Sequence, residues 1–173
     1  MMSLFDIRPM HLNDIESVLR IQAACYSGDI PESANSLRAK LVAAPRSCFV
    51  ATAEDEVIAY LIAIPWVSTA PPELNAPDCD IPTHADCLYL HDLSVHPNAR
   101  KSGVGRALIE CFFARCAQWQ YAQACLVAVQ NSAGYWRRFG FQTAPGSTLL
   151  AEKLASYAAD AEFLIYQMHG SYH

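Results

Sequence analysis

Hydrophobic and polar positions along this chain follow two different periods. Residues 48–53 and 57–64 are runs of β-branched, aromatic and small apolar side chains, which are typical of strands. The acidic segment 54–56 separates the two runs and indicates a hairpin. Further strands are expected at residues 5–8, 88–95, 124–129, from 141 onward and at 163–169.

Apolar residues recur every three or four positions in other parts of the chain, which predicts amphipathic helices. Asn13 and Glu16 have the spacing of a capping box, Pro45 stops a later repeat, and Gly140 suits the end of a short helix. Strands that alternate with helices predict an α/β or α+β fold with helices on both faces of a sheet, in one domain over residues 1–173. The expected helices cover residues 13–25, 33–43, 103 onward and 132–139.

The expected strand at 88–95 changes its pattern partway along. Leu88 and Leu90 alternate in one register, whereas Leu93 and Val95 alternate in the other. One extra residue in a strand moves all later side chains to the opposite face. We therefore expect a β-bulge near Asp92.

The stretch before this strand, residues 65–86, is rich in proline. Proline cannot continue a helix or a central strand, so the stretch predicts a long loop. Long loops in compact domains are usually functional or disordered. The prolines are Pro65, Pro71, Pro72, Pro77 and Pro82.

Charge is distributed unevenly around this loop. No Lys or Arg occurs between Ser47 and Ala99, and Arg100, Lys101 and Arg106 follow immediately. A negative region beside a compact positive one suits a cationic substrate and an anionic cofactor, although a solvated acidic surface has the same pattern. The acidic residues of the stretch are Glu54, Asp55, Glu56, Glu73, Asp78, Asp80, Asp86 and Asp92.

Composition excludes other classes of protein. The net charge of -5 argues against a nucleic-acid partner, because phosphate backbones are held by clustered cations. No apolar run reaches the ~20 residues of a membrane span, so we expect a soluble, cytoplasmic protein with no membrane partner. The 7 cysteines are expected to be reduced thiols.

Residues 100–106 lie between an expected strand and an expected helix. At such a turn the first amides of the helix have no partner within the helix, and together with the helix dipole they attract a diphosphate. Gly103 and Gly105 let a ligand approach the backbone, and Arg100 adds a charged donor. The residue order fits neither a Walker A loop nor a three-glycine dinucleotide fingerprint.

With its flanking segments, this turn resembles the GNAT superfamily of acyl-CoA-dependent N-acetyltransferases. Arg100, Gly103 and Gly105 match the family's Arg/Gln-x-x-Gly-x-Gly/Ala signature, and a strand that ends at 93–97 precedes them. Segment 135–141 is similar to the family's helix-to-strand step, which ends in an apolar residue, Gly and Phe. The motif of the 88–95 strand is nearest to the arylalkylamine N-acetyltransferase branch.

The resemblance implies a mixed, mostly antiparallel sheet of about six to seven strands that splays at a bulged fourth strand. It also implies acetyl-CoA as the cofactor, with no metal and no covalent enzyme intermediate, and places the thioester carbonyl near the Leu93 amide. Asn131 belongs to the implied cofactor site, although its position first indicates a helix cap. The residues expected at the cofactor are Leu93, Ser94, Val95, Arg100, Lys101, Ser102, Gly103, Val104, Gly105, Arg106, Asn131 and Trp136.

Proton transfer needs further residues, because an amine attacks only when it is neutral and the departing thiolate takes up a proton. His91 is the candidate base, since imidazole titrates near neutral pH; a packed core histidine is the competing interpretation. The segment is similar to a paired-histidine strand of the arylalkylamine branch, with Tyr89 in place of the first histidine. Trp136 stands where many members have a tyrosine acid, and indole cannot donate a proton near neutral pH, so the adjacent Tyr135 is the candidate acid. The competing interpretations are that Tyr135 packs in the core and that the thiolate leaves without a dedicated acid.

The second substrate and the reaction leave alternatives open. The acceptor is expected to be a small-molecule amine, with a protein N-terminus or lysine as the alternative. Trp136 in place of tyrosine favours another interpretation, a non-catalytic acyl-CoA-binding module. A zinc site formed by Cys79, His84, Cys87 and His91 is also considered, although its spacing matches no familiar finger. The sequence does not decide the oligomeric state, and a homodimer is left open.

Overall fold

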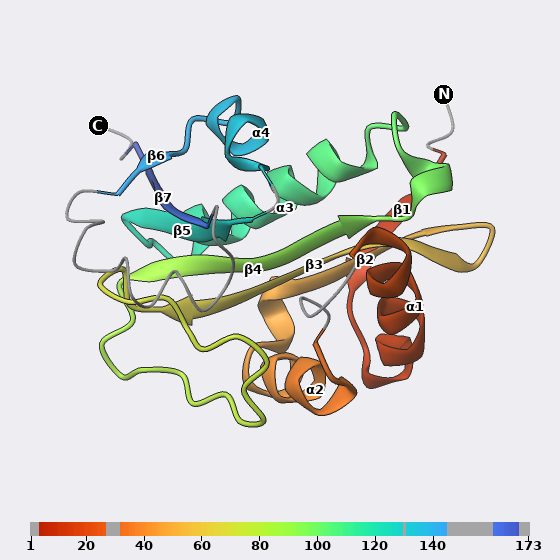
Figure 1. Ribbon diagram of the computed structural model, residues 1–173, viewed down its shortest axis with the longest axis horizontal. Coiled ribbons are helices and arrows are strands. Elements are labelled where there is room, and N and C mark those ends of the chain that lie inside the picture. Colours follow the sequence, from red (N-terminus) through yellow and green to blue (C-terminus); the bar gives the residue numbers. More distant parts are fainter. Residues whose placement is uncertain (1–3, 27–31, 130, 145–160, 170–173) are drawn as a thin grey trace.

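The computed structural model describes residues 4–26, 32–129, 131–144 and 161–169. Its centre is a 7-stranded sheet with the strand order β1-β2-β3-β4-β5-β7-β6 (Figure 1). Neighbouring strands are antiparallel except β4 and β5, which are parallel, so the mixed and mostly antiparallel sheet is confirmed. The strands are β1 (Asp6–Pro9), β2 (Cys48–Ala53), β3 (Glu56–Trp66), β4 (Cys87–Val95), β5 (Gln123–Ala128), β6 (Gln142–Thr143) and β7 (Glu162–Gln167).

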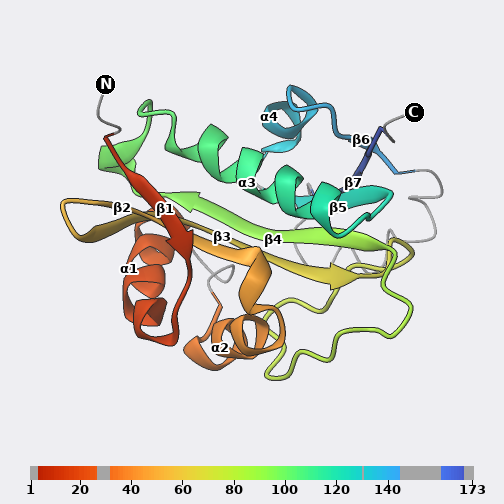
Figure 2. The same ribbon diagram turned by 180° about the vertical axis from the view of Figure 1, so that it is seen from behind.

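Helices cover both faces of the sheet, as the sequence predicts (Figures 1 and 2). One face carries α1 (Ile15–Cys25) and α2 (Ala34–Ala43), and the other carries α3 (Val104–Gln118) and α4 (Ala133–Arg137). None of the described helices has the length and apolar character needed to cross a bilayer. The cytoplasmic location stays a prediction.

Alternate side chains of the central strands pack on opposite faces of the sheet. Val50, Tyr60 and Ile62 share a buried cluster with residues of α1 and α2. Their neighbours Ala51 and Leu61 are buried in the cluster that includes α3. Both faces are apolar, which is why these strands read as continuous hydrophobic runs in the sequence.

The first long helix does not begin as expected. A 3-10 turn, Leu12–Asp14, precedes α1, and the carboxylate of Asp14 accepts a hydrogen bond from the His11 amide at 2.8 Å. The capping box predicted from Asn13 and Glu16 is therefore wrong, because Asp14 already satisfies this end of the helix.

The second helix, α2, begins and ends as predicted. Ser33 is its N-cap residue, and the Ser33 hydroxyl accepts the Ser36 amide at 3.2 Å. Leu37 and Leu41 are buried, and Pro45 follows the end of the helix.

β3 continues to Trp66, past the point where the sequence predicts a loop. Pro65 pairs with Leu88 of β4, whereas the last β3 residue that pairs with β2 is Ile62. Pro65 therefore has a strand neighbour on one side only, and its missing amide removes no bond on the β2 side. The expectation that Pro65 lies outside the strands is wrong for this reason. The rest of the stretch, residues 67–86, forms neither helix nor strand, as predicted.

Candidate active site

β4 carries the bulge that the sequence predicts. Two consecutive residues of β3 pair with Asp92 and with Leu90, so His91 is the extra residue between them. The bulge reverses the parity of the strand, and Leu90 and Leu93 consequently pack on the same core beneath α3. Asp92 faces the α1 side, where it contacts Tyr60.

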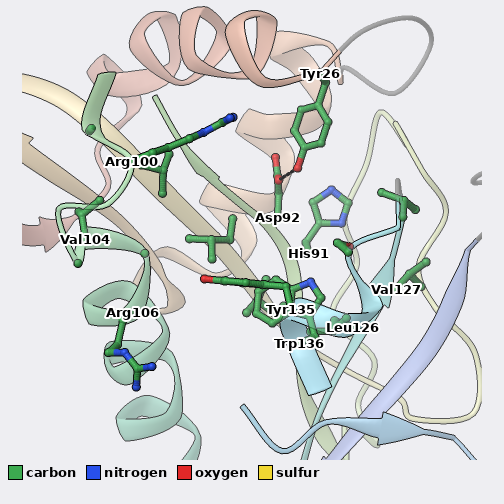
Figure 3. A pocket seen from close by; sticks show the side chains of 18 of the residues that line it. Tyr26, His91, Asp92, Arg100, Val104, Arg106, Leu126, Val127, Tyr135 and Trp136 are labelled. Atoms are coloured by element: carbon green, nitrogen blue, oxygen red, sulfur yellow. Dashed lines mark hydrogen bonds between the residues drawn. The ribbon is translucent and has the colours of Figure 1, made fainter. Parts of the chain in front are cut away.

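β4 and β5 diverge at this bulge. They pair only from Cys87–Leu90 to Gln123–Leu126, and β5 has no pair with the rest of β4. A cavity of about 500 Å³ opens between the diverging strands and the start of α3 (Figure 3). Its walls include Leu90, His91, Leu93 and Val95 from β4, Leu126 and Val127 from β5, and Tyr135 and Trp136 from α4.

The turn before α3 forms one end of this cavity. Lys101 and Gly103 have positive φ angles of 70° and 86°. The amides of Gly103, Gly105 and Arg106 donate to no other described residue, and all three residues line the cavity. A turn of this kind, with free amides at a helix start, is an anion-binding nest, so the backbone present fits a diphosphate.

The two arginines of the turn point in different directions. Arg100 reaches toward the end of α1, where its Nη2 lies 3.9 Å from the Cys25 sulfur. Arg106 points away from the cavity in Figure 3, and its guanidinium lies 5.3 Å from the centre of the Phe139 ring. Of the two side chains, only that of Arg100 brings its charge to the cavity.

The aromatic residues of α4 occupy different parts of the cavity wall. A Cβ added at Gly105 would lie 3.5 Å from Tyr135 Oη, so this hydroxyl reaches the start of α3 (Figure 3). Burial raises the pKa of Tyr135, and the charges of Arg138 and Arg106 oppose that rise. The Trp136 ring is buried and packs edge-on against the Tyr135 ring, with their centres 5.2 Å apart.

Asp92 receives donors on both of its carboxylate oxygens. Tyr26 donates to Oδ1 at 2.7 Å, Tyr60 donates to Oδ2 at 2.5 Å, and Ser94 donates to Oδ1 at 3.3 Å. Burial raises the pKa of Asp92, whereas the hydrogen bonds from the two tyrosines lower it. Burial and the Asp92 charge raise the pKa values of Tyr26 and Tyr60 well above the ordinary value, which keeps both hydroxyls protonated.

His91 contacts a second carboxylate, which comes from the segment before α2. Nε2 of His91 is hydrogen-bonded to Oε1 of Glu32, while Oε2 of Glu32 accepts Lys40 Nζ at 2.9 Å and Ser36 Oγ at 2.5 Å. Burial alone would raise the pKa of Glu32, but the attraction and hydrogen bond of His91 and the charge of Lys40 hold it well below its ordinary value. Glu32 is therefore an ionised carboxylate inside the protein.

A smaller cavity of about 40 Å³ lies on the other side of the bulge. Gln22, Glu32, Leu74 and Tyr89 line this smaller cavity and not the larger one. The wall between the two cavities is formed by residues that line both, namely Tyr26, His91, Asp92, Val127 and Val129.

Most residues predicted at the site from the sequence do line the larger cavity. Tyr89 instead lines the smaller one, where its ring centre is 6.2 Å from that of His91. The predicted residues at the larger cavity are His91, Leu93, Val95, Arg100, Lys101, Gly103, Val104, Gly105, Arg106, Tyr135 and Trp136.

Ser94, Ser102 and Asn131 do not line either cavity. The side chain of Ser94 belongs to the Asp92 network, and Ser102 Oγ donates to the carbonyl oxygen of residue 99 at 2.6 Å. The expectation that Asn131 caps the helix is wrong, because Ser132 is the N-cap residue of α4. Asn131 instead occupies a left-handed turn position with φ of 60°.

The sequence did not point to Tyr26, Glu32 or Lys40. Nothing in their local pattern marks them, because their contacts form only through the packing of α1 and α2 on the sheet. Tyr26 contacts Asp92, Glu32 contacts His91, and Lys40 contacts Glu32. Asp92 could have been identified from the sequence, since an acidic residue inside an apolar strand is rarely buried without a partner. It is also the one acidic residue of the stretch between positions 47 and 99 that lines either cavity, so that stretch is not a single substrate surface.

No group of three His, Cys, Asp or Glu side chains among the described residues is placed to hold a metal ion. His91, part of the zinc alternative, is bonded to Glu32 instead. All 7 cysteines are described and have free thiols.

Comparison with known proteins identifies the family. Residues 15–141 match the model of the Acetyltransferase (GNAT) family. No curated protein matches the sequence. Among solved structures, the fold is similar to Ard1 from Thermoplasma volcanium, with a TM-score of 0.75 and 17% identity over 96% of this chain and 99% of that one.

Two further structures have the same fold. One is the ribosomal-protein-S18-alanine N-acetyltransferase from Escherichia coli, with a TM-score of 0.66 and 17% identity over 96% of this chain and 97% of that one. The other is a GNAT family acetyltransferase from Brucella melitensis in complex with acetyl-CoA, with a TM-score of 0.63 and 18% identity over 98% of this chain and 91% of that one. Because the family model matches well over half of the residues, this chain belongs to the acetyltransferase (GNAT) family.

Proposed function

We propose that this protein transfers the acetyl group of acetyl-CoA to a primary amine of a small molecule, by direct attack in a ternary complex. Membership of the family makes the chain an acetyl-CoA-dependent N-acetyltransferase. The observation that supports the direct reaction is the bulge of β4, which places His91 and Asp92 between a large cavity and a small one.

The larger cavity suits the cofactor. Free amides of Gly103, Gly105 and Arg106 would hold the pyrophosphate, and Arg100 would add its charge. Beyond Leu90, β4 has no pair with β5, so its backbone can bind the pantetheine arm as a neighbouring strand would. The bound cofactor supplies the activated acetyl group.

Residues at the wall between the cavities suit proton transfer. His91 is proposed as the base that takes the proton of the acceptor amine. Tyr135 is proposed as the acid for the departing thiolate, because its hydroxyl projects into the cavity whereas Trp136 has no acidic group. Tyr89 lines the smaller cavity and is proposed to contact the acceptor.

The size of the smaller cavity supports a compact acceptor. Its volume is about 40 Å³, which leaves room only for a small group around the reacting amine, and the buried carboxylates of Glu32 and Asp92 in its wall disfavour an acceptor that carries its own carboxylate beside the amine. The competing acceptor is a peptide N-terminus, since the similar Escherichia coli protein is named for a ribosomal-protein alanine.

Release of free thiol from acetyl-CoA tests this function. The protein would be incubated with aralkylamines, polyamines, amino acids and N-terminal peptides, and we expect turnover with small amines to exceed turnover with peptides. Turnover with peptides alone would replace the small-molecule acceptor by a protein. Calorimetric binding of CoA without turnover on any amine would support a non-catalytic module.

A further inference from the structure

The two ring nitrogens of His91 have different environments. Nε2 is bonded to Glu32, whereas Nδ1 is buried and has no hydrogen-bond partner among the described residues. The side chain is only 3% exposed, yet His91 lines both cavities. Figure 3 shows its ring at the larger one. An unpaired buried nitrogen costs stability, so its placement calls for a ligand or a function.

The carboxylate oxygen of Glu32 that does not contact His91 has hydrogen-bond partners of its own. Lys40 and Ser36, both on α2, donate to Oε2, and Lys40 also donates to Ser36 at 2.9 Å. Gln22 of α1 donates to the Glu32 carbonyl at 2.9 Å. The ammonium of Lys40 balances the charge of the carboxylate when the imidazole is neutral, and a protonated imidazole adds its own attraction.

A carboxylate can only accept hydrogen bonds, which decides the position of the His91 proton. With Nε2 protonated to satisfy Glu32, the neutral ring has its lone pair on Nδ1. We infer that Glu32 is a positioning residue that fixes this tautomer of His91 and leaves Nδ1 as the proton acceptor at the cavities. This inference rests on the proposed N-acetyltransferase function.

The proton transfers balance in this arrangement. An N–H bond of the acceptor ammonium breaks, its electron pair stays on nitrogen, and the proton forms a new bond to Nδ1; the Glu32 carboxylate stabilises the resulting imidazolium. The amine then attacks the thioester carbon, the C–N bond forms, and the C–S bond breaks as the thiolate leaves. Tyr135 gives its proton to the thiolate to form the free thiol and takes the second N–H proton of the nitrogen in return, while the His91 imidazolium releases its proton to solvent, so the products are the amide, the free thiol and one proton.

Nitrogen NMR of protein labelled with ¹⁵N-histidine reads the tautomer without turnover. At about pH 8.5, where histidine is normally neutral, we expect wild-type His91 to carry its proton on Nε2. In Glu32→Gln the amide can donate or accept, so we expect a mixture of tautomers. A wild-type ring protonated on Nδ1, or a Glu32→Gln ring with an unchanged tautomer, would overturn the inference.

Steady-state kinetics tests whether Glu32 acts through His91 in the reaction. In Glu32→Gln we expect kcat to fall about 10- to 100-fold with the KM for acetyl-CoA unchanged, because a mixture of tautomers removes part of the ~10²–10⁴-fold that general-base catalysis contributes. In a His91→Ala background the same change should alter kcat less than about twofold, since residues that act as one unit are not additive. A full further loss in that background would show a structural role instead.

Glu32→Gln leaves the Lys40 ammonium buried without its partner, which can destabilise the fold. The double variant Glu32→Gln/Lys40→Met removes both charges and keeps similar side-chain volumes. We expect it to bind acetyl-CoA normally in calorimetry and to show the same loss of kcat. Normal kcat in this variant would contradict the positioning role. Absence of turnover by the wild-type protein on every amine would instead contradict the proposed function. The NMR measurement would still decide the tautomer of His91 in that case.

Discussion

Buried ionisable side chains contact one another where the two cavities join, and different hydrogen-bond donors stabilise each buried carboxylate. Asp92 is satisfied by hydroxyl donors, while Glu32 is satisfied by Lys40, Ser36 and His91. A buried carboxylate without such partners would lower the free energy of unfolding by ~3–5 kcal/mol. In this cluster the atom that the described residues leave without a partner is Nδ1 of His91, which is where a substrate proton is expected.

The lowered pKa of Glu32 predicts how stability responds to acid. Its ordinary pKa is 4.5, and the folded value lies well below this. The contribution of Glu32 is therefore fully present above about pH 5 and is lost as the pH falls through the ordinary value toward the folded one. In urea denaturation we expect the free energy of unfolding to drop by at least about 1 kcal/mol between pH 5 and pH 3 on account of this group. The slope should be shallower in Glu32→Gln/Lys40→Met, and an identical slope would contradict the prediction.

Replacing His91 by Ala should lower kcat about 100-fold or more, because a positioned base contributes on that order. The KM for acetyl-CoA should stay within about twofold, since His91 lies at the bulge and not at the phosphate nest. His84→Ala is the matched control, because His84 is exposed and lines neither cavity. Steady-state kinetics on both variants would settle the role, and an unchanged kcat in His91→Ala removes the residue from the mechanism.

At the scale of elements, the start of α3 can be tested separately from the chemistry. Gly103→Val should weaken binding of acetyl-CoA about 5- to 30-fold, because φ at this position is 86° and a branched side chain there costs ~1–2 kcal/mol. The new Cβ would also project into open space at the nest, where the diphosphate is expected. Calorimetry measures the change directly.

Gly134→Ala is the matched control for this element. Its Cβ also meets nothing within 4 Å, but Gly134 has no positive φ and lies inside α4. Alanine is a better helix former than glycine by ~1 kcal/mol, so this variant should be slightly more stable and bind the cofactor normally. Equal losses of affinity in the two variants would mean that the α3 nest is not the cofactor site.

Local pattern was sufficient for most elements and for half of the site. The run at 48–53 coincides with β2, the parity change locates the bulge within one residue, and the glycine turn marks the start of α3. These features depend on residues that are close together in the sequence. The acidic partner of His91 could not be found in this way, because Glu32 is separated from it by 59 positions and meets it only after two helices pack on the sheet.

At the scale of the whole molecule, the sheet itself creates the space for two substrates. Helices pack on both faces of the sheet around β4 (Figures 1 and 2). The bulged strand β4 pairs antiparallel with β3 on one side and parallel with β5 on the other. The cofactor is expected on the α3 side of β4 and the acceptor on the α1 side. We therefore expect the reacting groups to meet through a gap in the sheet rather than on a loop surface.

This arrangement predicts that both substrates are bound before any bond is made. The described residues that line the two cavities include no cysteine, and the serine among them, Ser132, lies at the start of α4 without a hydrogen bond to any described histidine. A nucleophile without a neighbouring base is poorly activated, so an acetylated enzyme is not expected to form. Initial rates measured over a grid of acetyl-CoA and amine concentrations should give intersecting double-reciprocal lines, and intact-mass spectrometry after incubation with acetyl-CoA alone should show no added acetyl group. Parallel lines together with a stable acetylated protein would instead establish a two-step transfer, and the shared wall of His91 and Asp92 would then need a different role.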